Sequence, residues 1–177
     1  IVLLTETAES DPHIVDKMKA KLMAGKDVVI TSGLLRALQG KGIEDICEVH
    51  ATDRKLLVDQ YWGADTKTNL SGNNPKSILF PQILLPTNDA WPWMPVVRGT
   101  ANGHGEPLLL MDHYGKGTFY VLTIPDNAND LYDLPEPTLN ALRSYLMRNL
   151  PVQMDAPSKV SLFLYNNGTF VVQSFRD

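Results

Sequence analysis

Short apolar runs alternate with amphipathic segments over the first forty residues. The run 1–4 has the length of a buried strand and is followed by polar residues. Four apolar residues then recur at helical spacing: Ile14, Val15, Met18 and Leu22. Asp11-Pro12 suits the start of that helix and Gly25 its end. A strand over 27–31 and a helix over 34–38 follow, so we expect parallel strands with right-handed crossovers.

The middle of the chain has a weaker pattern. Residues 50–77 are mixed, with a polar loop over 66–76. The apolar run 78–85 contains Pro81, which cannot donate to a strand ladder, so we expect an edge strand or a broken one. The segment 86–95, rich in proline and tryptophan, is expected to be irregular.

The C-terminal third predicts two hairpins and a helix between them. Runs 108–111 and 118–124 flank a Gly-Lys-Gly turn, and a leucine-rich helix is expected from Pro137 to Pro151. Runs 160–165 and 170–175 flank Asn167-Gly168, which predicts a type I′ turn with Tyr165 opposite Phe170. Because an isolated hairpin is only marginally stable, we expect this one to join a larger sheet or a separate β module.

Composition narrows the function classes. The chain has 177 residues, 44% of them hydrophobic, and a net charge of −4. Without a run of basic residues, we expect no nucleic-acid partner and no membrane partner. The single Cys47 excludes a disulfide framework within the chain. We expect a soluble protein and leave its compartment open, the periplasm and secretion included. Because the chain opens inside an apolar run without Met, we also expect a processed or truncated product.

No complete catalytic constellation is visible. Ser32 lacks the first glycine of a nucleophile elbow and is interpreted as a helix cap, and Cys47 as a small, semi-buried hydrophobe. The histidines lack zinc-site spacing, and the glycine-rich turns lack phosphate-binding frames. We therefore predict no catalytic residue, no cofactor and no metal site. A glycosidase pair stays open among six carboxylates: Glu6, Glu9, Glu106, Asp112, Asp126 and Asp130.

Two aromatic groups are the candidate ligand or interface residues: Tyr61 with Trp62, and Trp91 with Trp93. Sugars present C–H faces that pack on aromatic rings, and an exposed tryptophan is costly without a purpose. The alternative is that these rings close the end of a core, with each indole N–H bonded to a carbonyl.

Two stretches carry a family resemblance. Residues 11–38, above all 22–33 (LMAGKDVVITSG), resemble class I glutamine-amidotransferase-like domains, which are flavodoxin-like. The branch concerned is the non-catalytic one, as in the trimerisation domain of family-42 β-galactosidases. Residues 114–122 (YGKGTFYVL) resemble a late hairpin of the same domains, and 160–175 the small β domain that follows them. The amidotransferase cysteine is missing at Ser32-Gly33-Leu34, and His104-Gly105-Glu106 matches His-x-Glu in letters only.

These observations predict an α/β fold: a partial flavodoxin-like (Rossmann-like), mostly parallel sheet with helices on both faces, plus antiparallel hairpins near the C-terminus. We expect an amidotransferase-like domain over 1–154, lacking its first elements, and a β-hairpin module over 155–177. The predicted function is that of a non-catalytic accessory portion of a carbohydrate-active or sugar-binding protein, serving docking, oligomer contact or sugar-site shaping. The expected partners are a saccharide, an upstream domain and a second copy of the chain. A glycoside hydrolase or divergent amidotransferase-like hydrolase, and a plain interaction module, are the alternatives.

Overall fold

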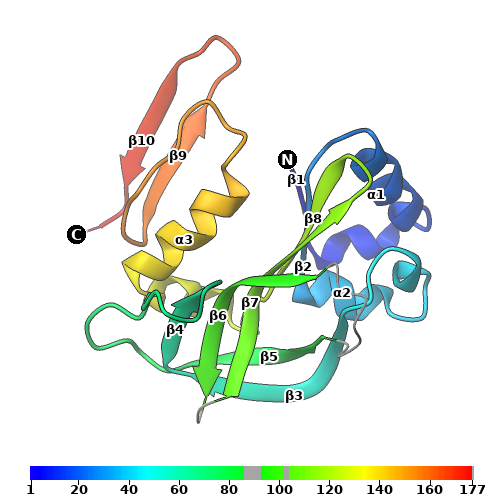
Figure 1. Ribbon diagram of the computed structural model, residues 1–177. Helices are drawn as coiled ribbons and strands as arrows, with labels where there is room; N and C mark the ends of the chain where they lie inside the picture. The colour runs from blue at the N-terminus through cyan, green and yellow to red at the C-terminus, as the bar shows by residue number, and fades with distance from the viewer. Residues whose placement is uncertain (86–92, 102–103, 177) are drawn as a thin grey trace.

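A central sheet of six strands organises the molecule (Figure 1). The computed structural model describes residues 1–85, 93–101 and 104–176. The strand order is β1-β2-β8-β7-β6-β4. The bounds of these strands are Val2–Leu4 (β1), Val28–Thr31 (β2), Gln60–Gly63 (β4), Met94–Ala101 (β6), His104–Tyr114 (β7) and Gly117–Leu122 (β8).

The sheet has a parallel half and an antiparallel half. Strands β1, β2 and β8 run parallel, whereas β8, β7, β6 and β4 pair antiparallel in turn. The predicted α/β class with antiparallel hairpins is confirmed. The parallel portion is shorter than the sequence predicted, because β6, β7 and β8 follow one another through connections too short for a crossover helix.

Helices cover both faces of the sheet, as expected. Helices α1 (Ile14–Met23) and α2 (Ser32–Leu38) pack on one face and α3 (Glu136–Leu146) on the other. The alternation of side chains along β2 explains the division, since Val28 and Ile30 face α1 and α2 while Val29 faces α3. The remaining helical segments are short 3-10 turns: η1 (Glu6–Ser10), η2 (Ile43–Asp45) and η3 (Ala128–Asp133).

Local signals set the first helices. Helix α1 begins at Ile14 with His13 as its N-cap, so the predicted start at Asp11-Pro12 lies outside the helix. The Asp11 carboxylate accepts a hydrogen bond from the His13 backbone N–H at 3.0 Å just before it. Gly25 follows α1 with φ +81°, as expected of a helix end. The cap of α2 is Thr31, whose hydroxyl accepts from the Leu34 N–H at 3.3 Å. The prediction that Ser32 is the cap is therefore wrong. The Ser32 hydroxyl instead accepts from the backbone N–H of Ile124 at 3.0 Å, which joins α2 to the end of β8.

A second, two-stranded sheet lies below the antiparallel half of the first (Figure 1). It pairs β3 (His50–Val58) with β5 (Ile78–Leu84). Within residues 1–85, 93–101 and 104–176, strand β5 pairs only with β3, so the predicted edge position of Pro81 is confirmed. The sequence left residues 55–60 open between a short strand and a helix and did not predict the full length of β3, because most of its side chains are exposed and its apolar pattern is weak.

The C-terminal hairpin stands apart from both sheets. Strands β9 (Val160–Leu164) and β10 (Phe170–Ser174) pair only with each other, so the expectation of a larger sheet within residues 1–177 is wrong for the described residues. The register is also one residue away from the prediction, with Phe170 opposite Leu164. Only Gly168 of the turn has a positive φ (+82°), so the loop is a turn closed by a left-handed glycine and not type I′. Helix α3 is also shorter than predicted, because it ends at Leu146 and not at Pro151.

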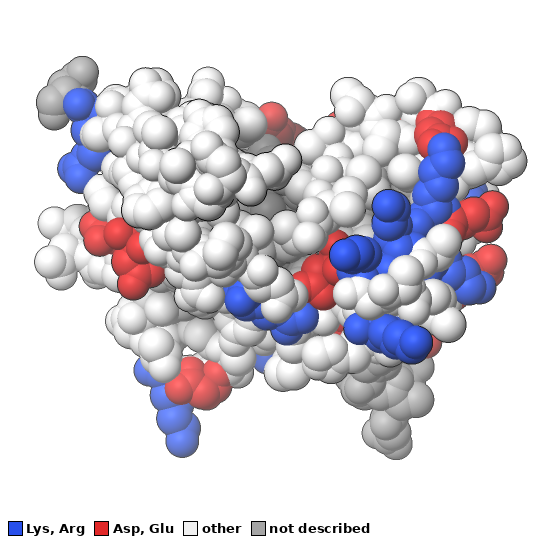
Figure 2. All heavy atoms as spheres, turned by 90° about the horizontal axis from the view of Figure 1, so that it is seen from above, with Lys and Arg blue, Asp and Glu red and all other residues white. Residues whose placement is uncertain are grey.

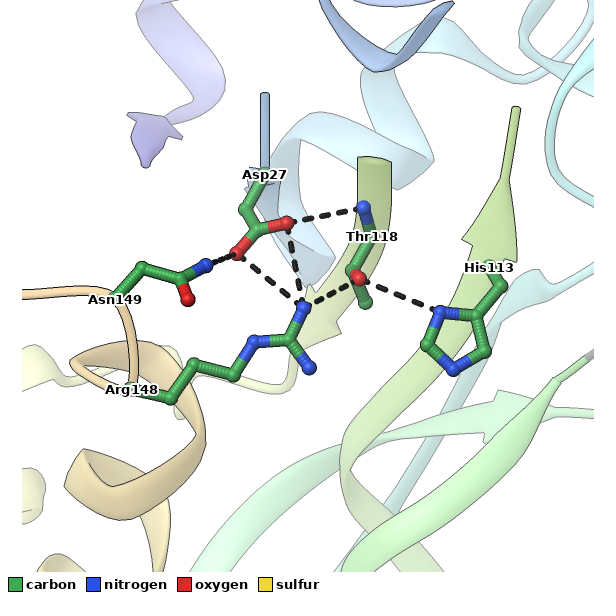
Figure 3. Close-up of polar contacts among 5 residues, drawn as sticks. All are labelled: Asp27, His113, Thr118, Arg148 and Asn149. Atoms are coloured by element: carbon green, nitrogen blue, oxygen red, sulfur yellow. Dashed lines mark hydrogen bonds and ion pairs between the residues drawn. The ribbon is translucent and has the colours of Figure 1, made fainter. Parts of the chain in front are cut away.

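A buried carboxylate joins α3 to the sheet (Figure 3). Asp27, at the start of β2, is 7% exposed and accepts from the Thr118 N–H at 3.0 Å and from the Asn149 amide at 2.6 Å. The Arg148 guanidinium lies 3.4 Å from the same carboxylate and donates to the Thr118 hydroxyl at 2.5 Å. It also stacks over the Tyr120 ring, 5.7 Å from its centroid. These contacts fix the chain after α3, which leads to the hairpin.

Candidate functional site

The antiparallel end of the large sheet carries a polar and aromatic face. Trp62 lies opposite Arg98, and Gln60 opposite Thr100, in the β4–β6 register. Residues paired in this way project from the same side of a sheet, so the four side chains share one surface. The sequence could not place them together, because β4 and β6 are more than thirty residues apart and pair through non-local contacts.

Two cavities open beside this face and share Arg98 and Gly105. One, of about 640 Å³, is lined by Asp59, Gln60, Trp62, Thr66, Arg98, Thr100 and Gly105. The other, of about 670 Å³, has Trp93 in its wall together with Gln82, Glu106 and apolar residues of β5 and β6. Both volumes are typical of ligand pockets, which combine apolar walls with a few polar groups.

The two cavities, which share Arg98 and Gly105, are together called the groove. Its polar side chains differ in their hydrogen bonds. The Gln82 amide donates to the Glu106 carboxylate at 3.4 Å, which orients both at the wall of the larger cavity. Arg98 lines both cavities, and its buried Nε has no hydrogen-bond partner among the described residues. Sequence reasoning missed Arg98, because one arginine in a strand gives no local signal.

The predicted aromatic residues fall in different places. Trp62 is half-buried and lines the smaller cavity. Trp93 is 3% exposed and packs edge-on against Phe119 with 5.3 Å between ring centroids, so it is also part of the core. Tyr61 is fully buried opposite Gly99, and burial raises the pKa of its phenol. Trp91 lies outside the described residues. The ligand or interface role of these residues stays a prediction.

A third cavity, of about 490 Å³, lies at the carboxyl ends of the parallel strands. It gathers three of the six candidate carboxylates: Glu6, Glu9 and Asp126. Glu9 lies 3.3 Å from the Lys41 amine, and Asp126 is ion-paired with Lys55. Two of the three carboxylates are therefore each paired with a lysine. A glycosidase pair among the six acids stays a prediction.

Other reactive groups are buried. Cys47 is 1% exposed, and burial raises the pKa of its thiol to about 12, with the charge of Asp112 adding to the effect. Cys47 packs as a small hydrophobe, as interpreted, but it is fully buried and not semi-buried. Among the described residues, no group of three or more His, Cys, Asp or Glu side chains is placed to hold a metal ion. In the same residues, no helix has both the length and the apolar character that crossing a bilayer requires.

The C-terminal hairpin presents an apolar surface, which we call the hairpin surface. Six large apolar side chains of residues 160–175 are 44–55% exposed: Phe163, Tyr165, Phe170, Val171, Val172 and Phe175. Residues 160–175 contain no Asp, Glu, Lys or Arg. Figure 2 shows the contrast: over the hairpin the surface facing the viewer is white, with charged side chains at its rim, whereas the side of the molecule with α1 carries both signs across its surface. Exposed apolar area of this kind marks an interaction surface.

The hairpin segment is similar to a known family. Residues 151–177 match the family described as "Probable glycosyl hydrolase, C-terminal domain". The C-terminal segment is therefore related to glycosyl hydrolases, in agreement with the predicted link to carbohydrate-active proteins. No protein of curated function matches the chain.

Several solved structures are distantly similar. The β-galactosidase from Rahnella sp. R3 is 15% identical with a TM-score of 0.48, over 90% of this chain and 24% of that one. The β-galactosidase from the haloarchaeon Halorubrum lacusprofundi is 17% identical with a TM-score of 0.48, over 90% and 23%. A cytoplasmic protein of Salmonella typhimurium LT2 is 12% identical with a TM-score of 0.41, over 62% and 48%. The chain thus spans half or less of these proteins, and likeness at this level establishes no shared function.

Proposed function

We propose that this chain is a non-catalytic accessory portion of a larger glycosyl hydrolase, and that the hairpin surface docks it on a neighbouring β-structured domain of that hydrolase. The observation that carries the proposal is the hairpin itself: two paired strands with no further strand at either edge among the described residues, and apolar side chains exposed on both faces. Such a hairpin is marginal in water and gains stability when a partner covers it. The family match of residues 151–177 favours a hydrolase as the partner.

Hydrogen bonds from α3 fix the segment that precedes β9, while large apolar side chains of the hairpin stay exposed. The Ala156 N–H donates to the Asn140 side chain of α3 at 3.0 Å, and the Arg143 guanidinium donates to the carbonyls of Ala156 and Pro157. Asn140 and Arg143 therefore set the direction in which the hairpin leaves α3. A hairpin with a fixed orientation can dock at one defined place, which a loosely tethered hairpin would not do. The amidotransferase-like origin of residues 1–154 stays a proposal beside this one.

The test compares one substitution in two contexts. Val172 is 52% exposed, so Val172→Lys should change the free energy of unfolding of the isolated 177-residue chain by less than about 0.5 kcal/mol. In the complete polypeptide that carries the chain, the lysine would enter an apolar interface, and we expect a loss of about 2 kcal/mol or more. Leu57→Lys is the matched control, since Leu57 is 57% exposed on β3. Equal effects of Val172→Lys in both contexts would contradict docking.

The alternative occupant of the hairpin surface is a second copy of the chain. Sedimentation of the isolated chain over a range of concentrations separates the two cases. A monomer supports docking on another domain, whereas a dimer that Val172→Lys dissociates would replace that proposal with self-association.

A further inference from the structure

Arg98 places a buried polar atom without a partner at the groove. Its guanidinium forms no hydrogen bond and no ion pair with the described side chains, and its Nε is buried without a partner. A guanidinium carries five N–H donors in a fixed plane, and leaving them without acceptors inside a protein is unfavourable. The side chain lies where the two cavities meet, so an acceptor in either cavity could complete it.

The charges around Arg98 define the chemistry of a ligand. Asp59 lines the smaller cavity and Glu106 the larger one, so the groove has no excess of positive charge. An anionic ligand would meet a carboxylate in each cavity. A hydroxyl group can bind next to either charge, because it accepts a hydrogen bond from a guanidinium and donates one to a carboxylate. The amides of Gln60 and Gln82 add groups that can do both.

Trp62 supplies the apolar part of the groove. Its ring lies on the same side of the sheet as Arg98 and borders the smaller cavity. A flat aromatic wall beside planar polar groups matches a sugar ring, which has an apolar C–H face and a rim of hydroxyls. We propose that the two cavities are adjoining subsites for a neutral oligosaccharide, with one ring against Trp62, the next beside Gln82 and Glu106, and Arg98 bonding hydroxyls at the junction.

This inference is independent of the hairpin surface and predicts a dependence on chain length. A monosaccharide fills one subsite, whereas a disaccharide spans both, and linking two weakly held rings raises affinity. The test is an NMR titration of the 15N-labelled chain with glucose, cellobiose and cellotriose, and with galactose and β-1,4-galactobiose. We expect the Trp62 indole and the Arg98 Nε–H signals to shift, with disaccharides at least about tenfold tighter than monosaccharides.

Variants assign the site. Trp62→Ala should weaken disaccharide binding by about tenfold or more, whereas Trp62→Phe should retain part of it, since it keeps a ring. Arg98→Gln should weaken binding of the disaccharide more than that of the monosaccharide. Tyr132→Ala is the matched control, because Tyr132 is an aromatic residue 53% exposed outside the groove. An unchanged melting temperature shows that each variant is folded.

Three results would overturn the inference. One is the absence of shifts at the groove with every sugar at about 10 mM, since subsites of this kind should bind at millimolar level or better. Another is tighter binding of digalacturonic acid than of galactobiose, which would assign the groove to anions. The last is binding that Trp62→Ala leaves intact, which would place the sugar elsewhere.

Discussion

Replacing Asp27 with alanine should destabilise the fold far more than replacing an exposed acid. The substitution leaves the N–H of Thr118, a residue only 2% exposed, without its acceptor. A buried donor without a partner costs about 1–3 kcal/mol. The Arg148 side chain is 34% exposed, so water can replace the lost carboxylate and we count no more than about 1 kcal/mol for that contact. The expected loss is therefore about 1–4 kcal/mol.

The assay is urea unfolding followed by circular dichroism, together with a thermal scan. For a chain of this size, each kcal/mol lowers Tm by about 2–4 °C, so Asp27→Ala should lower it by about 2–16 °C. Asp16→Ala, at a carboxylate 85% exposed, is the control and should change little. The double variant with Arg148→Ala should lose less than the sum of the two single variants, because both act on one network. A loss below about 0.5 kcal/mol for Asp27→Ala would refute this reading of the cluster.

Four further predictions follow from single positions. Gly117→Ala should cost about 2 kcal/mol or more in a urea titration, since its Cβ would lie 2.4 Å from the Lys26 carbonyl oxygen. Asp112→Asn should stabilise the fold at pH 7 by about 1 kcal/mol, because Asp112 is buried with an unpaired oxygen. Burial raises the pKa of Asp112, so this acid favours folding at low pH and loses that contribution as pH rises, and the gain from Asn should vanish in acid. Arg143→Ala should make hairpin amides exchange faster with solvent without unfolding the sheet. Finally, the isolated chain should hydrolyse none of a panel of nitrophenyl glycosides, and turnover lost in Glu6→Gln would instead make it an enzyme.

Local chemistry predicted the elements whose signals lie within a few residues. The apolar stripe of α1 and Gly25 are close in sequence, and the structure uses both as expected. The N-cap prediction for Asp11 is wrong, since α1 begins at Ile14 with His13 as its N-cap. Elements set by distant pairing were missed or misplaced. Strand β3 has little apolar character and exists because β5 pairs with it. The register of the C-terminal hairpin differs from the prediction because Gly168 alone takes a positive φ, which lengthens the loop.

The candidate sites likewise depend partly on local sequence and partly on pairing between distant segments. Composition identified Trp62 and Trp93 as unusual, but it could not show that the first borders a cavity while the second is also core. Arg98 became a candidate only when the β4–β6 pairing placed it opposite Trp62. The sequence shows the hairpin surface as two apolar runs. That these runs are exposed follows only from the structure, in which no other described strand pairs with them.

Hydrogen exchange at the hairpin tests the docking account most directly. In the part of the chain that the structure describes, β9 and β10 pair only with each other. Amides at their outer edges should therefore exchange within seconds to minutes in the isolated chain, while those of β8 in the central sheet exchange slowly. In the complete polypeptide that carries the chain, a docked hairpin should protect the same β9 and β10 amides by about tenfold or more, with β8 unchanged. Equally fast exchange of β9 and β10 in both proteins would contradict a docking role for the hairpin surface.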